Sequence, residues 1–290
     1  MNLKKLYHDF FSPRTKSELY FVHRRDSNLG DQLSAPYLYY AFKEHQVLDI
    51  CDAKAIAKMP QKAQLIIGGG GLIMPYFDAY RAALLARNPS KLVWWGIGER
   101  RIQNLETAYL SETAAQASIE PQWFEERHLV GFRQTTPYYP FLPCVSCKAV
   151  AEYREKKPQA SHQYPVVYFE HRHVPLPTQT QYPVRNNEGE SAHDVFSFLD
   201  QAPIVVTNSY HGMYWSTLLG KQVVVLPFSS GLYHNPWPVH YANHQNVSEI
   251  IQGLSKLPPE NTTKWLKDCI ERNDAFYQLV LNYFASSEWV

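Results

Sequence analysis

The sequence predicts an α/β protein of two Rossmann-like domains that face each other across a cleft, followed by an amphipathic helix. Three observations support this prediction. Short apolar runs alternate with helix-like stretches, as expected for βα units of a parallel sheet. The alternation breaks near residue 150 and then resumes. The length of 290 residues, of which 45% are hydrophobic, provides enough apolar material for two cores.

The first half of the chain contains five runs that are typical of buried strands. These runs cover residues 19–22, 47–50, 64–67, 92–95 and 128–132, with helical patterning at about 32–42, 77–86 and 105–118. Several runs end in glycine or polar residues, which are common in turns. We therefore expect a first Rossmann-like domain over residues 1–147.

A change of composition separates the two halves. Residues 138–147 are rich in proline and aromatic side chains, and residues 152–161 are polar, which predicts a linker or surface loop. The second half then offers strands at 166–169, 203–206 and 222–226, helices at 192–199 and 212–219, and a long loop at 174–190. We expect a second domain over residues 148–264. The C-terminal segment, residues 265–290, is expected to be largely helical and to pack back on the first domain.

The charge balance argues against a nucleic-acid partner. Lys and Arg number 28 against 27 Asp and Glu, which leaves no basic surplus for a phosphate backbone. No apolar stretch follows Met1 in the manner of a secretory signal, and no run approaches the roughly 20 apolar residues of a membrane span. We therefore expect a cytoplasmic protein, and contact with the inner face of a membrane stays open.

The cysteines and histidines do not predict a metal site. Cys144 and Cys147 form a lone C-x-x-C, whereas a zinc ribbon needs a second pair, and Cys51 and Cys269 stand far apart. Buried, reduced cysteines are expected ahead of a redox pair. The H-x-H pair at residues 171–173 has no third ligand at motif spacing.

The loops that follow the strands contain the candidate site residues, because open parallel sheets bind ligands at the carboxyl ends of their strands. Gly69, Gly70 and Gly71 follow the third strand directly, where glycine lets the backbone approach an anion or a sugar. A tight packing turn is the alternative. The tract is not a dinucleotide fingerprint, since Ile73 stands where the last glycine would be.

Two charged residues stand at other strand ends. Asp31 opens a helix after the first strand, where it either caps that helix or presents a carboxylate that accepts a proton from a sugar hydroxyl. Arg133 follows the fifth strand, and its guanidinium suits a carboxylate or a phosphate. A surface salt bridge is the alternative for Arg133.

The most specific candidate is His211, which follows an apolar strand and precedes Gly212 and a helix. An imidazole can give or take a proton near neutral pH. Ser209 and Tyr210 share its turn. Further cleft candidates at other strand ends are Arg24, Arg25, Asn28, His171 and Arg172.

Taken together and in this order, the motifs resemble those of the polysaccharide pyruvyl transferase family. The resembling segments are N-x-G-D at 28–31, the glycine tract at 65–72, W-G-I-G at 95–98, V-G-F-R at 130–133, S-Y-H-G at 209–212 and L-G-K-Q-V at 219–223. They span about residues 19–230. Ser209 departs from the family, since many members have an arginine there, and the loop 227–231 lacks a lysine that some members carry.

The resemblance implies a GT-B-like enzyme that transfers a pyruvyl group from phosphoenolpyruvate to two hydroxyls of a sugar, forming a ketal and releasing phosphate. The acceptor would be a sugar or lipid-linked oligosaccharide of a bacterial-type surface polysaccharide, such as a capsule or exopolysaccharide. No cofactor or metal is implied. Arg133 would bind phosphoenolpyruvate, assisted by Ser209, Tyr210 and the glycine tract, with Arg24, Arg25 or Arg172 replacing the missing charge.

The chemistry of this transfer assigns roles to two residues. His211 as an imidazolium would protonate the methylene carbon of phosphoenolpyruvate, and Asp31 would act as the base for the sugar hydroxyls. A GT-B-like glycosyltransferase that uses a nucleotide sugar is the first alternative function. A glycan-binding protein without catalytic activity is the second.

Overall fold

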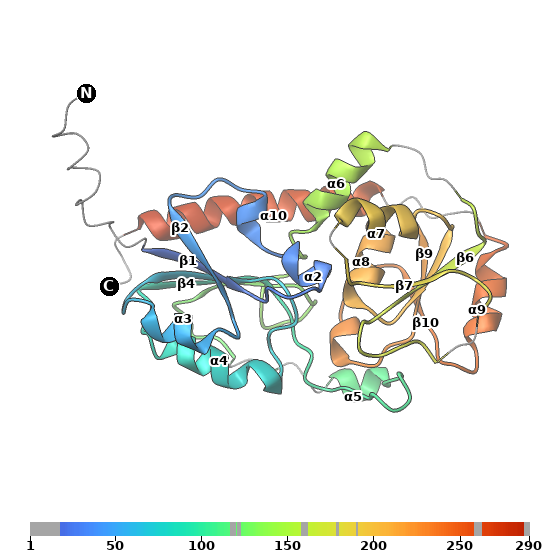
Figure 1. Ribbon diagram of the computed structural model, residues 1–290, viewed down its shortest axis with the longest axis horizontal. Helices are drawn as coiled ribbons and strands as arrows, with labels where there is room; N and C mark the ends of the chain where they lie inside the picture. The colour runs from blue at the N-terminus through green and yellow to red at the C-terminus, as the bar shows by residue number, and fades with distance from the viewer. Residues whose placement is uncertain are drawn as a thin grey trace, which may run out of the picture.

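The computed structural model describes residues 18–116, 120, 123–157, 162–177, 180–189, 191–257 and 263–286. Within them the chain forms two parallel sheets of five strands each, which lie side by side (Figure 1). The long helix α10 (Thr263–Ala285) runs along the upper side of the first sheet in this view and reaches the second domain. The predicted fold class, two Rossmann-like α/β domains with a C-terminal helix, is confirmed.

The first sheet has the order β2-β1-β3-β4-β5, and every neighbouring pair is parallel. Its strands are β1 Leu19–His23, β2 His45–Asp49, β3 Gln64–Gly68, β4 Lys91–Ile97 and β5 Leu129–Phe132. Helices α3 (Ala53–Lys58) and α4 (Pro75–Leu85) cover one face, where Ile56 and Leu84 pack with Ile67. The whole of β4 is buried, as expected for a parallel strand with both faces covered.

The second sheet has the order β10-β9-β8-β6-β7 and is also parallel throughout. Its strands are β6 Val166–Glu170, β7 Val184–Asn186, β8 Ile204–Thr207, β9 Gln222–Val225 and β10 Val239–Tyr241. Helices α6 (Cys147–Lys156), α7 (Ala192–Leu199) and α8 (Tyr210–Leu218) share one core, and α9 (Val247–Leu254) covers the opposite face. The carboxyl ends of β6 and β8 therefore carry the loops that begin with His171 and Asn208.

Helix α10 contributes to both domains. Its Cys269 belongs to the core of the second domain, whereas Phe276 packs on the first sheet. Between these two, the buried Asn273 side chain accepts a hydrogen bond from Trp95 Nε1 at 2.9 Å. The helix thus fixes the two sheets relative to each other, which is a requirement for a site made from both.

Two helices expected in the first domain are shorter in the structure. The helix expected at 32–42 is replaced by α2 (Leu29–Gln32) and the 3-10 turn η1 (Pro36–Leu38). The proline has no backbone N–H to donate and restricts the residue before it, so a continuous helix cannot form. The helix expected at 105–118 is reduced to α5 (Glu112–Gln116), and its last two expected residues lie outside the described part of the chain.

The second domain holds more regular structure than the sequence predicts. The expected linker at 152–161 begins inside α6, where Tyr153 is buried, and residues 158–161 lie outside the described ranges. The expected loop at 174–190 contains β7, and both β10 and α9 are additional elements. Strands of three residues are too short to show a clear period.

The cysteines match the expectation of buried thiols. All four are free, and Cys144, Cys147 and Cys269 are buried. Among the described residues, no helix has both the length and the apolar side chains that a bilayer span requires.

Candidate active site

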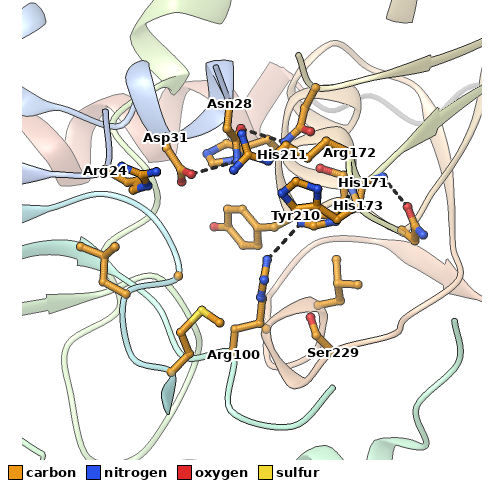
Figure 2. Close-up of a pocket in the computed structure, with 18 of the residues that line it drawn as sticks. Arg24, Asn28, Asp31, Arg100, His171, Arg172, His173, Tyr210, His211 and Ser229 are labelled. Atoms are coloured by element: carbon orange, nitrogen blue, oxygen red, sulfur yellow. Dashed lines mark hydrogen bonds between the residues drawn. The ribbon is translucent and has the colours of Figure 1, made fainter. Parts of the chain in front are cut away.

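A cavity of about 360 Å³ lies between the two domains and is lined by loops from both sheets. Its lining includes most of the predicted site residues, namely Arg24, Asn28, Asp31, Gly71, Arg133, His171, Arg172, Ser209, Tyr210 and His211. Arg25, Gly69 and Gly70 are not among the lining residues. Figure 2 shows Asp31, Tyr210 and Arg100 around this space, with Arg100 directed at His171.

Arg133 is a buried cation at the centre of the site. It directly follows β5, is only 3% exposed, and stacks its guanidinium 3.7 Å from the ring centroid of Tyr210. Its Nε has no hydrogen-bond partner, and no carboxylate among the described residues lies within ion-pair distance of it. The surface salt bridge considered for Arg133 is therefore wrong, and its guanidinium is available to a ligand anion.

Two glycines create the space that Arg133 occupies. A Cβ atom at Gly98 would lie 2.1 Å from Arg133 Nε, and one at Gly71 would lie 3.1 Å from Nη2. Atoms cannot approach to 2.1 Å without a bond, so only glycine fits at position 98 while the arginine keeps this position. The last glycine of the W-G-I-G motif and the last glycine of the tract thus serve the site by leaving room for the Arg133 side chain.

Gly69 and Gly70 form a turn and are not among the residues that line the cavity. They have φ angles of +63° and +91°, which favour glycine, and the Gly69 N–H already donates to Trp95 O at 3.1 Å. A Cβ at Gly70 would lie 2.9 Å from Asp31 Oδ1. These contacts favour the packing alternative for Gly69 and Gly70, and donor contact by their amides stays a prediction.

Arg100 is a site residue that the sequence analysis misses. It follows β4, and its Nη1 lies 3.2 Å from His171 Nε2 in the second domain. With the Gln103 amide oriented so that its oxygen faces Arg100, this oxygen accepts from Arg100 Nε and Nη2 at 2.8 and 3.0 Å. Burial lowers the pKa of Arg100 to about 10. The residue stands two positions after the W-G-I-G motif at the end of β4, which is the signal that could have identified it.

The other arginines of the cavity are already paired. Arg172 lies 2.5 Å from Asp26, and Arg24 lies 2.6 Å from Asp49 and 3.3 Å from Asp26. Their charges are therefore largely neutralised, and Arg25 is exposed and outside the lining. These pairs argue against Arg24, Arg25 or Arg172 as the source of the missing positive charge. Arg100 and Arg133 are the arginines of the lining that have no carboxylate partner among the described residues.

His171 is neutral and orients Arg100. Burial, followed by the charge of Arg100, lowers the pKa of His171 to about 3. Its Nε2 accordingly accepts a hydrogen bond from the Arg100 guanidinium. The Asn208 side chain accepts from the His171 backbone N–H at 2.7 Å, which fixes the loop after β6 against the loop after β8.

Asp31 is a carboxyl group without an ion pair among the described residues. Its Oδ2 accepts from Asn28 Nδ2 at 2.9 Å, and Asn28 itself is the N-cap of α2. The capping alternative for Asp31 is therefore wrong. Burial and then Asp26 raise the pKa of Asp31 from 3.8 to about 6, against the opposing effects of Arg133 and Arg100. This carboxyl can hold a proton near neutral pH.

His211 stands at the first turn of α8 and is enclosed. Its ring packs on Gly30, where a Cβ atom would lie 2.1 Å from Nδ1. Ser34 Oγ donates to Gly30 O at 2.6 Å, so this hydroxyl accepts at 3.3 Å from His211 Nε2–H, leaving Nδ1 unprotonated. Burial and the charge of Arg133 lower the pKa of His211 well below its usual range.

The electrostatics thus reverse the two roles expected from the sequence. In the ligand-free protein, burial and the charge of Arg133 favour the neutral ring of His211, which argues against an imidazolium acid there. Asp31, expected as the base, keeps its proton to a higher pH than His211 does. Among the described residues, no cluster of three His, Cys, Asp or Glu side chains could bind a metal. The arrangement is suited to a small anion and to proton transfer beside it.

Comparison with known proteins gives a broad structural likeness. No protein-family model and no curated protein matches the sequence. A functionally uncharacterised protein from Klebsiella pneumoniae matches 84% of this chain and 99% of its own, with 14% identity and a TM-score of 0.45. The ADP-heptose LPS heptosyltransferase II of E. coli matches 89% of this chain and 99% of its own, with 12% identity and a TM-score of 0.28. A family 9 glycosyl transferase from Veillonella parvula matches 92% of this chain and 97% of its own, with 10% identity and a TM-score of 0.30. Sequence identities and TM-scores as low as these give no information about the substrate of this chain.

We predict that Gly98→Ala weakens the binding of inorganic phosphate by about tenfold or more, because the added Cβ displaces the Arg133 guanidinium. Isothermal titration calorimetry measures the affinity. Gly253→Ala is the matched control, since a Cβ at Gly253 meets nothing within 4 Å. Equal affinity in the Gly98→Ala variant and the unmodified protein would contradict this account of Arg133.

The pKa of Asp31 predicts how stability depends on pH. The folded protein keeps this proton up to about pH 6, whereas the unfolded chain loses it near 3.8, so the group's contribution to stability falls as pH rises through that interval. The substitution Asp31→Asn removes this pH-dependent loss of stability. The free energy of unfolding of the variant, relative to the unmodified protein, should therefore rise by about 2–3 kcal/mol between pH 4 and pH 8. Denaturant titrations at both pH values test this, and a constant difference would refute it.

Proposed function

We propose that the protein is a transferase that binds a small phosphate- or carboxylate-bearing donor in the interdomain cavity and passes a group from it to a sugar hydroxyl. One observation supports this above the others: Arg100 and Arg133 line the same cavity without a carboxylate partner among the described residues. Burying an unpaired charge costs several kcal/mol. A ligand that brings a compensating negative charge explains why the protein buries two such arginines in one cavity.

Phosphoenolpyruvate is the donor that we propose. It carries a carboxylate and a phosphate a short distance apart, so one anionic group can bind Arg133, whose Nε has no partner, and the other can bind the N–H groups of Arg100 that His171 and Gln103 leave free. The cavity of about 360 Å³ is at the small end of ligand sites, which suits a compact anion. The motif resemblance to polysaccharide pyruvyl transferases supports the same donor, with a surface-polysaccharide sugar or lipid-linked oligosaccharide as the acceptor.

Asp31 is the acid and base of the proposed reaction. A bound anion offsets Arg100 and Arg133, which hold the pKa of Asp31 down, so donor binding favours the protonated carboxyl. Asp31 gives its proton to the methylene carbon while a sugar oxygen bonds to the neighbouring carbon. The carboxylate then takes the proton of that hydroxyl. A second hydroxyl oxygen displaces the phosphate, which leaves with the remaining proton, and the ketal ring closes.

His211 is a positioning residue in this scheme. Its ring packs against Gly30, and its Nε2 bonds Ser34 at the end of the same turn. The imidazole of the second domain thereby fixes the segment that carries Asp31. We expect His211→Ala to impair turnover through the position of Asp31.

Glycosyl transfer from a nucleotide sugar is the second candidate. It is favoured by the cavity lying at the carboxyl ends of two parallel sheets, where nucleotide phosphates commonly bind. A diphosphate would also complement Arg100 and Arg133. The two candidates therefore share the anion site and differ in the ligand.

We predict that phosphoenolpyruvate raises the thermal midpoint of the unmodified protein by several degrees when it is well above its Kd. Arg133→Met should abolish this shift and leave the ligand-free midpoint unchanged or higher, because a buried unpaired charge is removed. Arg272→Met is the control, since Arg272 lies outside the cavity lining, where it pairs with Asp268 along α10 and lies 5.5 Å from the ring centroid of Phe141.

The same thermal-shift experiment separates the candidates. A shift with a nucleotide sugar and none with phosphoenolpyruvate would favour glycosyl transfer. No shift with either would contradict the transferase proposal and favour a glycan-binding protein. A pyruvate ketal detected by mass spectrometry after incubation with sugar acceptors would establish the reaction itself.

A further inference from the structure

The cavity has a second side that the donor does not explain. Its lining on the first domain includes the apolar side chains of Leu72, Met74, Tyr76 and Phe77, which follow β3 and begin α4. Tyr76 is 58% exposed, whereas Phe77 is 8% exposed. Tyrosine is enriched at binding surfaces, because its ring offers a large apolar face while its hydroxyl stays in water.

The ring of Tyr76 is held in place although it is exposed. It follows Pro75, the first residue of α4, and meets the ring of Phe77 edge-on at a centroid distance of 4.8 Å. A third ring, Tyr80, lies 6.2 Å away, and the phenol oxygen accepts from Cys51 Sγ at 3.9 Å. These contacts reduce the rotamer freedom that a ligand would otherwise have to remove.

The polar groups on this side of the cavity compensate one another. Asp26 receives both Arg24 and Arg172, and Arg24 also reaches Asp49. They present hydrogen-bond donors and acceptors without a large surplus charge. A neutral ligand that is rich in hydroxyls complements such a surface, whereas a second anion does not.

We infer that Tyr76 is the platform on which the acceptor sugar stacks, with its hydroxyls directed at Arg24 and Asp26. The inference rests on the proposed function and names the acceptor subsite within it. The C–H groups on one face of a pyranose ring are apolar and weakly positive, and they pack favourably on the negative face of an aromatic ring. Because Tyr76 and Asp31 line one cavity, a sugar on this platform lies beside the proton carrier.

Saturation-transfer NMR tests the platform with the methyl β-glycosides of galactose, glucose and mannose as probes and the full chain as receptor. We expect transfer to the ring C–H protons of at least one glycoside. Tyr76→Ala should weaken that glycoside's affinity by about tenfold, and Tyr76→Phe, which keeps the ring, should retain it. Tyr138→Ala is the matched control, since Tyr138 is 49% exposed and lies outside the cavity lining.

Two outcomes overturn the inference. One is the absence of saturation transfer to all three glycosides in the unmodified protein. The other is an affinity that Tyr76→Ala leaves unchanged. The thermal shift with phosphoenolpyruvate is measured on the same variants, so the two proposals are tested separately. If phosphoenolpyruvate raises the thermal midpoint but no glycoside receives saturation, only the platform is refuted. If a glycoside receives saturation but phosphoenolpyruvate does not raise the thermal midpoint, the proposed donor is refuted.

Discussion

The site depends on one contact between the domains, the Arg133 guanidinium over the ring of Tyr210 at 3.7 Å. The arginine follows the last strand of the first sheet, and the tyrosine begins α8 of the second. A cation on an aromatic face is stabilised without being neutralised. The charge can therefore be buried between the domains and still be offered to an anion, and Gly98 exists as glycine to make room for it.

The same buried charge sets the protonation of its neighbours. It lowers the pKa of His211, which burial has already depressed, and it opposes the burial that raises the pKa of Asp31. A neutral imidazole and a carboxyl that titrates near pH 6 result. An anion that offsets Arg133 raises the proton affinity of both groups, so binding of the donor and readiness for proton transfer are linked.

The sequence predicted the sheets well and the site in part. Apolar runs located the long strands because strands buried on both faces are continuously hydrophobic, and Asp31, Arg133 and His211 were placed together by the strand-end rule. Pro36 ended a helix that its neighbours favoured. Arg100 lies three residues beyond the end of β4, so the strand-end rule alone did not distinguish it from an ordinary loop arginine. The protonation of His211 depends on its burial against Gly30, and a sequence without contacts does not reveal that.

A crystal structure of the unmodified protein with phosphoenolpyruvate would show whether the two buried arginines bind the donor. We expect the ligand between their guanidiniums, with its carboxylate or phosphate oxygens about 3 Å from both Arg100 and Arg133. A ligand bound elsewhere on the protein, or one that touches neither guanidinium while the cavity between the domains stays as it is, would contradict this expectation.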